Sequence, residues 1–180
     1  MGRVQTGDGE AFTSLVERHQ GALQRYLTRV LGCPDRAAEL AQETFIRAFQ
    51  HAGRYEPTGP FATWLFTIAT NRARQELRRQ RRWRFVPLLP GPAEGNGHGP
   101  IPAQPEATLL REELTVRLEA AVAALPARFR LPVVLRDVEG KSYDEIGRIL
   151  GCRLGTVKSR VNRGRHLLKT RLRCYLENDA

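Results

Sequence analysis

One stretch of the chain combines side chains whose chemistry suits contact with a polyanion: FATWLFTIATNRARQELRRQRRWR, residues 61–84. It holds one acid, Glu76, against seven arginines from Arg72 to Arg84. At 100° per residue, apolar side chains fall on one side and polar ones on the other. The polar side carries Thr63, Thr67, Thr70, Asn71, Arg74 and Arg78, with Trp64 and Gln75 at its margin. Cations suit phosphates, amides and hydroxyls suit base edges, and an indole suits an unpaired base. The alternative is a solvated face with Trp64 half buried at the core edge.

The most specific pattern is SYDEIGRILGCRLGTVKSRVNRGRHLLK, residues 142–169. Ser142 followed by Glu145 predicts a capping box, and LGC predicts a turn between a short helix and a longer one, which is helix-turn-helix spacing. The longer helix should bury Val157, Val161, Gly164 and Leu168 and expose Lys158, Ser159, Asn162, Arg163 and His166. The exposed set can reach base edges in a major groove, and Arg153, Thr156, Arg160 and Arg165 are placed for phosphates.

A third pattern lies in CPDRAAELAQETFIRAFQ, where Pro34 or Asp35 can begin a helix that runs to about His51. Its core face should be Ala38, Ala41, Phe45, Ala48 and Phe49. The other face places Leu40 and Ile46 among charged and amide side chains, a mixture typical of a protein-docking surface. The alternative is that a third helix covers this face.

Composition limits the class of protein. The 180 residues carry a net charge of +10, and residues 148–173 hold nine basic residues and no acid, which predicts a nucleic-acid partner. The twelve N-terminal residues are polar and the longest apolar run is AAVAAL, so we expect a cytoplasmic protein that does not insert into a membrane. Four scattered histidines and three widely spaced cysteines indicate no catalytic group, metal site or cofactor, and we expect reduced thiols and no enzyme.

Helical periodicity also extends over residues 8–31, 109–125, 126–137 and 155–176, with Pro132 expected to kink or break its helix, and no alternating strand pattern occurs. Residues 86–108 hold six of the eleven prolines and no Lys or Arg, which is typical of a flexible linker. We therefore predict an all-α protein of two small helical domains, 1–85 and 109–180, the second with the helix-turn-helix.

These three motifs, in this order and joined by a linker, resemble the bacterial sigma-70 family of RNA polymerase sigma factors, specifically the short extracytoplasmic-function (ECF) group. The resemblance covers nearly the whole chain. It implies that 1–85 is sigma region 2, which docks polymerase and recognises and melts the −10 element, and that 109–180 is sigma region 4, which reads the −35 element. The implied partners are core RNA polymerase, promoter DNA and an anti-sigma factor.

The resemblance also implies roles for individual residues. Asn71 matches the position that captures a flipped −10 base, and Trp64 lies where the family supports strand separation. The full sets are Trp64, Thr70, Asn71, Arg74, Gln75, Arg78 and Arg81 for the −10 element; Arg153, Thr156, Lys158, Ser159, Asn162, Arg163 and Arg165 for the −35 element; and Glu39, Leu40, Gln42, Glu43, Ile46 and Arg47 for polymerase.

Two other functions fit part of the pattern. A stand-alone repressor or activator explains the helix-turn-helix but leaves the docking face and the first basic helix unexplained. A protein that coats RNA or DNA without sequence preference explains the charge but leaves the helix-turn-helix unexplained. Tight specific binding to duplex without polymerase would favour the former, and sequence-independent binding the latter.

Overall fold

The computed structural model describes residues 1–56, 59–83 and 106–177, and its regular elements within these ranges are all helical. In chain order they are α1 (Gly2–Gln5), α2 (Gly9–Leu31), α3 (Pro34–Gln50), the 3₁₀ turn η1 (Ala52–Arg54), α4 (Phe61–Trp83), α5 (Glu106–Ala123), α6 (Ala127–Val133), the π-helical turn η2 (Val134–Val138), α7 (Tyr143–Leu150) and α8 (Leu154–Glu177). The predicted all-α class is confirmed. Of the predicted linker, residues 86–105 lie outside the described part, and 106–108 begin α5.

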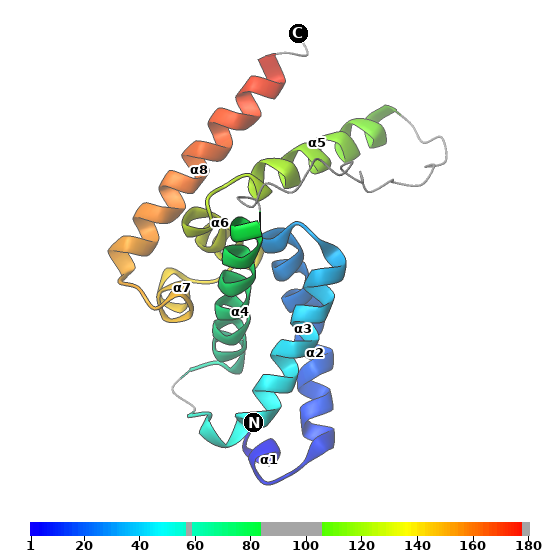
Figure 1. Cartoon of the computed structure of the whole chain (residues 1–180), viewed down its shortest axis with the longest axis vertical. Helices are drawn as coiled ribbons and strands as arrows, with labels where there is room; N and C mark the ends of the chain where they lie inside the picture. Colours follow the sequence, from blue (N-terminus) through cyan, green and yellow to red (C-terminus); the bar gives the residue numbers. More distant parts are fainter. Residues whose placement is uncertain (57–58, 84–105, 178–180) are drawn as a thin grey trace.

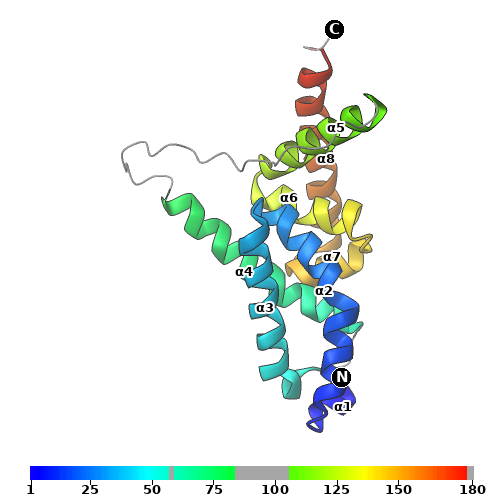
Figure 2. The same ribbon diagram turned by 90° about the vertical axis from the view of Figure 1, so that its right-hand side faces the viewer.

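Three long helices, α2, α3 and α4, make up most of the first half of the chain (Figures 1 and 2). α2 begins where the Asp8 carboxylate accepts a hydrogen bond from the backbone N–H of Ala11 at 2.9 Å, and it ends at Gly32 with φ of 71°. These are the cap and the left-handed stop that helix ends favour. Between the helices lies an apolar core of Leu23, Tyr26, Leu27, Val30, Ala37, Ala41, Leu65, Phe66 and Ala69.

Two short elements of this half, α1 and η1, have no counterpart among the predicted helices. Each spans four residues or fewer, too few for helical periodicity to show in the sequence. The Gln5 side-chain amide joins them by donating to the backbone carbonyls of Ala52 at 3.1 Å and Tyr55 at 2.9 Å. The N-terminus is therefore held against the segment that precedes α4.

The second half is built from α5 to α8, and its α7–turn–α8 unit follows the predicted boundaries closely. The Ser142 hydroxyl accepts from the Glu145 N–H, and the Glu145 carboxylate accepts from the Ser142 N–H at 2.8 Å, so the predicted capping box is present. Pro132 lies inside α6, and the α-helical pattern ends one residue later, where the π-helical turn η2 begins. A proline lacks the N–H that an α-helix needs, which accounts for an irregularity here.

The two halves pack against each other and share one continuous hydrophobic core. Polar contacts cross the boundary: Arg74 Nη2 donates to the Leu150 carbonyl at 3.0 Å, and Arg130 donates to the Val30 carbonyl. The Lys141 ammonium lies 4.9 Å from the centre of the Phe66 ring. The two guanidinium groups thus bind carbonyls in the last turns of α7 and α2, where cations offset the helix dipole.

Candidate nucleic-acid interface and docking surface

The polar side of α4 is narrower than the sequence predicts. Asn71, Gln75 and Arg78 are exposed along one strip, and Trp64 lies on the same side of α4 about two turns before Asn71, half buried. The Trp64 ring packs with its centre 5.2 Å from that of Tyr55 and 5.9 Å from that of Phe61. These two aromatic rings support the indole, which is half buried on the same side of α4 as the strip, and an indole placed there can stack an unpaired base.

Thr70 is not part of this strip. Its side chain is 0% exposed, and its hydroxyl pairs with the Tyr26 hydroxyl at 2.8 Å. Burial raises the pKa of Tyr26, so the pair consists of neutral hydroxyl groups. The expectation that Thr70 stands among the exposed polar residues is therefore wrong, because α2 covers this side of α4. Thr63 is buried as well, so the exposed polar strip excludes both threonines.

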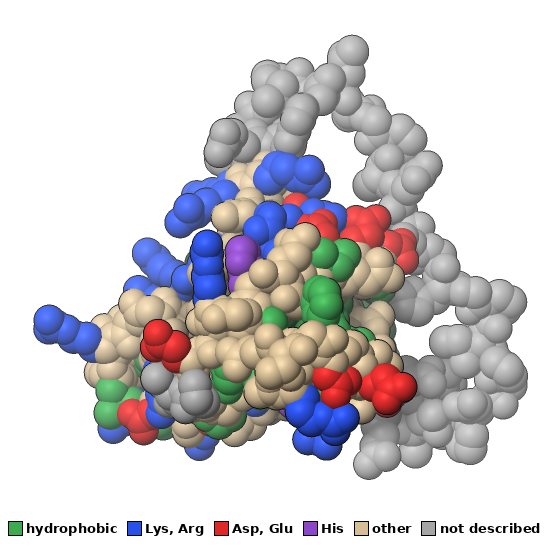
Figure 3. All heavy atoms as spheres, turned by 90° about the horizontal axis from the view of Figure 1, so that it is seen from below, with side chains coloured by type: hydrophobic (Ala, Val, Ile, Leu, Met, Phe, Trp, Pro, Cys, Tyr) green, Lys and Arg blue, Asp and Glu red, His purple; other side chains and the backbone are tan. Residues whose placement is uncertain are grey.

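Arginine side chains from both halves of the chain converge next to this strip. Around a cavity of about 310 Å³ lie Arg74, Arg78 and Arg81 of α4, Arg128 of α6 and Arg160 of α8, over an apolar floor of Leu77, Ala127, Leu131, Pro132 and Leu150. Among the described residues, no acidic side chain lines this cavity. Five guanidinium groups this close together make the local potential positive and favour anions. Seen from below, the described surface carries Lys and Arg side chains mainly on the left and in the upper part of the view (Figure 3).

The single acid of the opening stretch, Glu76, serves the fold of the first half. It is 6% exposed and accepts from Arg36 at 3.1 Å and from Arg79 at 3.1 Å. Arg36 also pairs with Glu43, which accepts from Arg72 too. The Arg72 hydrogen bond lowers the pKa of Glu43. These ion pairs join α3 to α4 and hold two of the seven arginines, Arg72 and Arg79, in contacts within the protein.

The outer face of α8 carries the predicted base-reading side chains. Lys158, Ser159, Asn162 and Arg163 are all exposed. On the opposite face Val157 and Val161 are 0% exposed, and Gly164 is buried against α6. A Cβ on residue 164 would lie 2.5 Å from Val133 Cγ2, so only glycine permits this close approach of the two helices. The predicted division of α8 into a buried and an exposed face is confirmed for these residues.

The side chains predicted to bind phosphates around α8 differ in their surroundings. Arg153 is exposed and Thr156 is half buried. Arg165 forms an ion pair with Asp137 of η2, with Nε donating to Oδ2 at 3.0 Å. This pair raises the pKa of Arg165. Because the pair is largely exposed, it is weak enough to exchange for a phosphate contact.

The face of α3 predicted to dock a protein contains different apolar residues from those expected. Leu40 is 1% exposed because α4 packs on this side of α3. The expectation that Leu40 is an exposed aliphatic side chain is therefore wrong. For Leu40 the alternative prediction, that a third helix covers this face, is correct. Ile46 is 56% exposed, as predicted. Phe49, expected in the core, is 52% exposed, with its ring 5.0 Å from that of Phe12. Glu39, Gln42 and Arg47 surround Ile46 as exposed polar neighbours.

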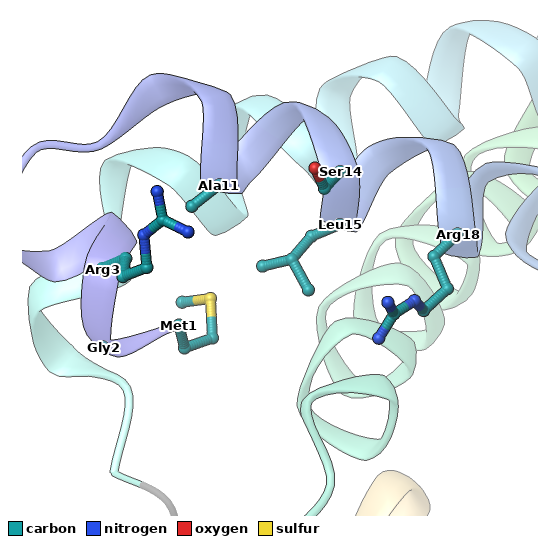
Figure 4. Close-up of a pocket in the computed structure, with 7 residues that line it drawn as sticks. All are labelled: Met1, Gly2, Arg3, Ala11, Ser14, Leu15 and Arg18. Carbon is teal, nitrogen blue, oxygen red and sulfur yellow. The ribbon is translucent and has the colours of Figure 1, made fainter.

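Nothing in the described residues resembles a catalytic centre. They contain no group of three or more His, Cys, Asp or Glu side chains that could hold a metal ion. No helix in the described ranges is both long and apolar enough to cross a membrane. A cavity of about 480 Å³ between α1 and α2 is lined by Met1, Gly2, Arg3, Ala11, Ser14, Leu15 and Arg18 (Figure 4). None of the predicted DNA- or polymerase-binding residues lines that cavity.

Comparisons with known proteins agree on one family. The model of Sigma-70 region 2 matches residues 15–83, and that of Sigma-70, region 4 matches residues 115–168. The chain is 41% identical over 170 residues to the ECF RNA polymerase sigma factor SigE of Mycolicibacterium smegmatis, covering 91% of this chain and 63% of that protein. It is 32% identical over 175 residues to the ECF RNA polymerase sigma factor SigW of Bacillus subtilis, covering 95% and 94%.

Solved structures show the same fold. CnrH, in complex with the cytosolic domain of CnrY, matches with a TM-score of 0.69 and 26% identity, covering 99% of this chain and 96% of that one. The sigma factor RpoE of Bartonella quintana, in complex with the anti-sigma factor NepR, matches with a TM-score of 0.70 and 24% identity, covering 91% of this chain and 98% of that one.

A helical protein with a helix-turn-helix and a second basic, aromatic-bearing helix has the features of DNA-binding transcription factors. Its matches over both region models and over nearly the full length of SigW define it further: the chain belongs to the sigma-70 family, in the ECF group. Proteins of this family direct transcription initiation and are not enzymes.

Proposed function

We propose that this sigma factor joins core RNA polymerase through α3, reads the −35 element with α8, and traps an unpaired −10 base with Asn71 of α4 to nucleate strand separation. Arg78 and Arg81 then hold phosphates of the separated strands, and Trp64 supports the opened end of the duplex. The family resemblance also implies an anti-sigma factor as a partner. The proposed mechanism consists of binding steps alone.

The observation that carries this proposal is the exposed strip of α4. Asn71 offers an amide that can both donate to and accept from a base edge, Gln75 offers a second, and the indole of Trp64 lies on the same side of α4 about two turns before Asn71. A protein that reads only duplex DNA would need the exposed face of α8 and not the strip on α4. A surface that combines amides with an aromatic ring suits a base that has left the stack.

The direct test is run-off transcription from genomic DNA with core RNA polymerase, with and without this protein. We expect a set of start sites that appears only when the protein is added, with a shared sequence near −35 and another near −10. Start sites that do not depend on the protein, or dependent ones without shared elements, would contradict promoter-specific initiation.

Two neighbouring arginines of α8 should separate base reading from phosphate binding. A base-edge contact contributes about 1–3 kcal/mol of discrimination. Arg163→Ala should therefore flatten the preference at one −35 position, whereas Arg165→Ala should weaken binding to all sequences alike. Titration of the full chain against duplexes substituted at each position measures both effects. Equal losses on every duplex for the two variants would remove Arg163 from the reading set.

The packing of the two halves also bears on −10 binding. Arg74 donates to the Leu150 carbonyl across the boundary, whereas the reading face of α8 stays exposed. We expect that freeing Arg74 requires the halves to separate. Lys141→Ala removes the ammonium that rests on the Phe66 ring, a contact worth roughly 0.5–2 kcal/mol.

The Lys141→Ala variant should bind a single-stranded −10 oligonucleotide a few-fold more tightly and bind −35 duplex as the wild type does. Fluorescence anisotropy with the two probes measures these affinities. Removing a cation normally weakens binding to DNA, so a gain in affinity for the −10 oligonucleotide would indicate that the packing of the two halves limits this binding. A loss of affinity for both probes would show that Lys141 contacts DNA directly and that the packing of the two halves does not limit −10 binding.

A further inference from the structure

The exposed polar face of α8 continues well past the residues assigned to base reading. Side chains three or four apart lie on one side of a helix, and this spacing leads from Ser159 through Asn162 to His166, and then to Lys169 and Thr170. All five side chains are exposed. His166, Lys169 and Thr170 are named here the distal strip. Figure 1 shows α8 as one long helix whose C-terminal half extends away from α7.

The distal strip carries no apolar side chain, and α8 has no acidic residue between Leu154 and Arg173. In the described part of the chain, the side chains of His166 and Lys169 make no ion pair or hydrogen bond, and the Thr170 hydroxyl donates to the His166 carbonyl at 3.1 Å. Asp137 pairs with Arg165, which lies one turn before Lys169, and it forms no ion pair with Lys169. The Lys169 ammonium is therefore not neutralised within the described structure.

Helix geometry places the distal strip at the edge of a groove rather than at its floor. Lys169 lies seven residues beyond Asn162, about 10 Å along the axis at 1.5 Å per residue. The major groove is about 12 Å wide and curves around the duplex. A straight helix that inserts the turn around Asn162 therefore leaves the bases within about two turns. Side chains on the same face then meet the sugar-phosphate backbone.

We propose that the distal strip binds phosphates of the duplex that flanks the −35 element, so that α8 is a base reader in its first half and a backbone clamp in its second. This rests on the proposed −35 reading by α8. Continuity with the reading face and complementary charge identify duplex DNA as the occupant. A protein surface that docked here would gain no apolar contact, because the strip offers none.

The test compares Lys169→Ala with Arg171→Ala in the full chain. Arg171 is exposed on the same turn but about 200° around the helix from Lys169, so both variants lose one positive charge and only one alters the strip. The probes are three duplexes with the same −35 element: one cut at its ends, one extended upstream by about one helical turn, and one extended downstream.

Lys169→Ala should bind one extended duplex about threefold more weakly than the wild type and reduce the slope of log affinity against log salt by about one, with no change in sequence preference. It should bind the cut duplex normally. Arg171→Ala should match the wild type on all three duplexes. The clamp is refuted if the two variants behave alike, if Lys169→Ala binds every duplex normally, or if its loss is the same on the cut duplex.

Failure of the underlying proposal would look different. If the wild type does not prefer the −35 element to a scrambled duplex, base reading by α8 fails, whatever Lys169 does. If the wild type discriminates and the Lys169→Ala variant binds all three duplexes normally, only the clamp fails. If Lys169→Ala weakens binding to core polymerase and leaves DNA binding intact, the occupant of the strip is a protein and the clamp is refuted.

Discussion

Ile46→Glu combined with Phe49→Glu should remove most binding to core RNA polymerase from a protein that remains folded. Both side chains are about half exposed on α3; Ile46 has exposed polar neighbours, and the Phe49 ring packs on one side against Phe12. Burying such a side chain in an interface contributes about 1.5–3 kcal/mol, and a buried unpaired carboxylate costs more than the contact that it replaces. Titration of labelled protein with core polymerase should show at least a hundredfold weaker affinity.

A matched control is available on α2. Gln20→Glu with Gln24→Glu adds the same two charges at exposed positions of α2, and this variant should bind polymerase as the wild type does. Circular dichroism and thermal unfolding establish that both variants are folded. Normal polymerase binding by a folded Ile46→Glu, Phe49→Glu variant would move the docking surface away from α3.

Leu40 separates a fold defect from a docking defect. It fills the interface between α3 and α4 with almost no exposure, so Leu40→Ala should destabilise the protein by about 2–5 kcal/mol. Its remaining folded fraction should bind polymerase normally. A direct reading of the sequence pattern places Leu40 beside Ile46 in one surface, whereas the structure assigns them different surroundings.

Periodicity and caps predict the α7–α8 unit well because the forces involved are local. Ser142 and Glu145 lie three residues apart, and the alternation of Val157, Val161 and Gly164 with polar residues needs only one neighbouring helix to bury it. The all-α class follows from the same signals. The order of the three motifs is also visible in the sequence, and it is what the resemblance rests on.

The sequence does not predict the exposure of three side chains, Thr70, Leu40 and Phe49. Whether Thr70 is exposed depends on Tyr26, which lies 44 residues away and offers a hydroxyl at hydrogen-bond distance. Leu40 lies at the edge of the buried face of α3, and it is buried because α4 packs over that edge. The contact of Arg74 with Leu150 spans 76 residues. The spacing of residues within one helix does not predict which distant element packs against the edges of its buried face.

Asn71→Ala should leave polymerase docking and −35 binding intact and slow promoter opening. Asn71 is exposed on α4, and within the described residues its side chain makes one long hydrogen bond, in which Oδ1 accepts from Arg74 Nη1 at 3.4 Å. Loss of its amide would leave a flipped −10 base without its hydrogen bonds, which costs about 1–3 kcal/mol. That cost corresponds to a roughly 5- to 150-fold lower fraction of open promoter, since 1.36 kcal/mol is tenfold.

Permanganate reactivity of −10 thymines reports the opening directly, and run-off transcription reports its product. Asn162→Ala is the matched control, because it removes the same amide from the exposed face of α8. That variant should lose −35 discrimination and open normally once bound at saturating concentration. If α4 and α8 have the proposed roles, Asn71→Ala is defective only in promoter opening and Asn162→Ala only in −35 discrimination.

A pre-melted promoter distinguishes capture of a base from general DNA affinity. A bubble at −10 removes the cost of strand separation, so it should restore much of the activity of Asn71→Ala and of Trp64→Ala and leave the lost base contact as the residual deficit. Arg81→Ala should instead lose affinity on every promoter and reduce the slope of log affinity against log salt by about one, because its exposed guanidinium is proposed to hold a phosphate. If Asn71→Ala opens duplex promoters at the wild-type rate in a folded protein, base capture belongs to Gln75 or another neighbour on the strip.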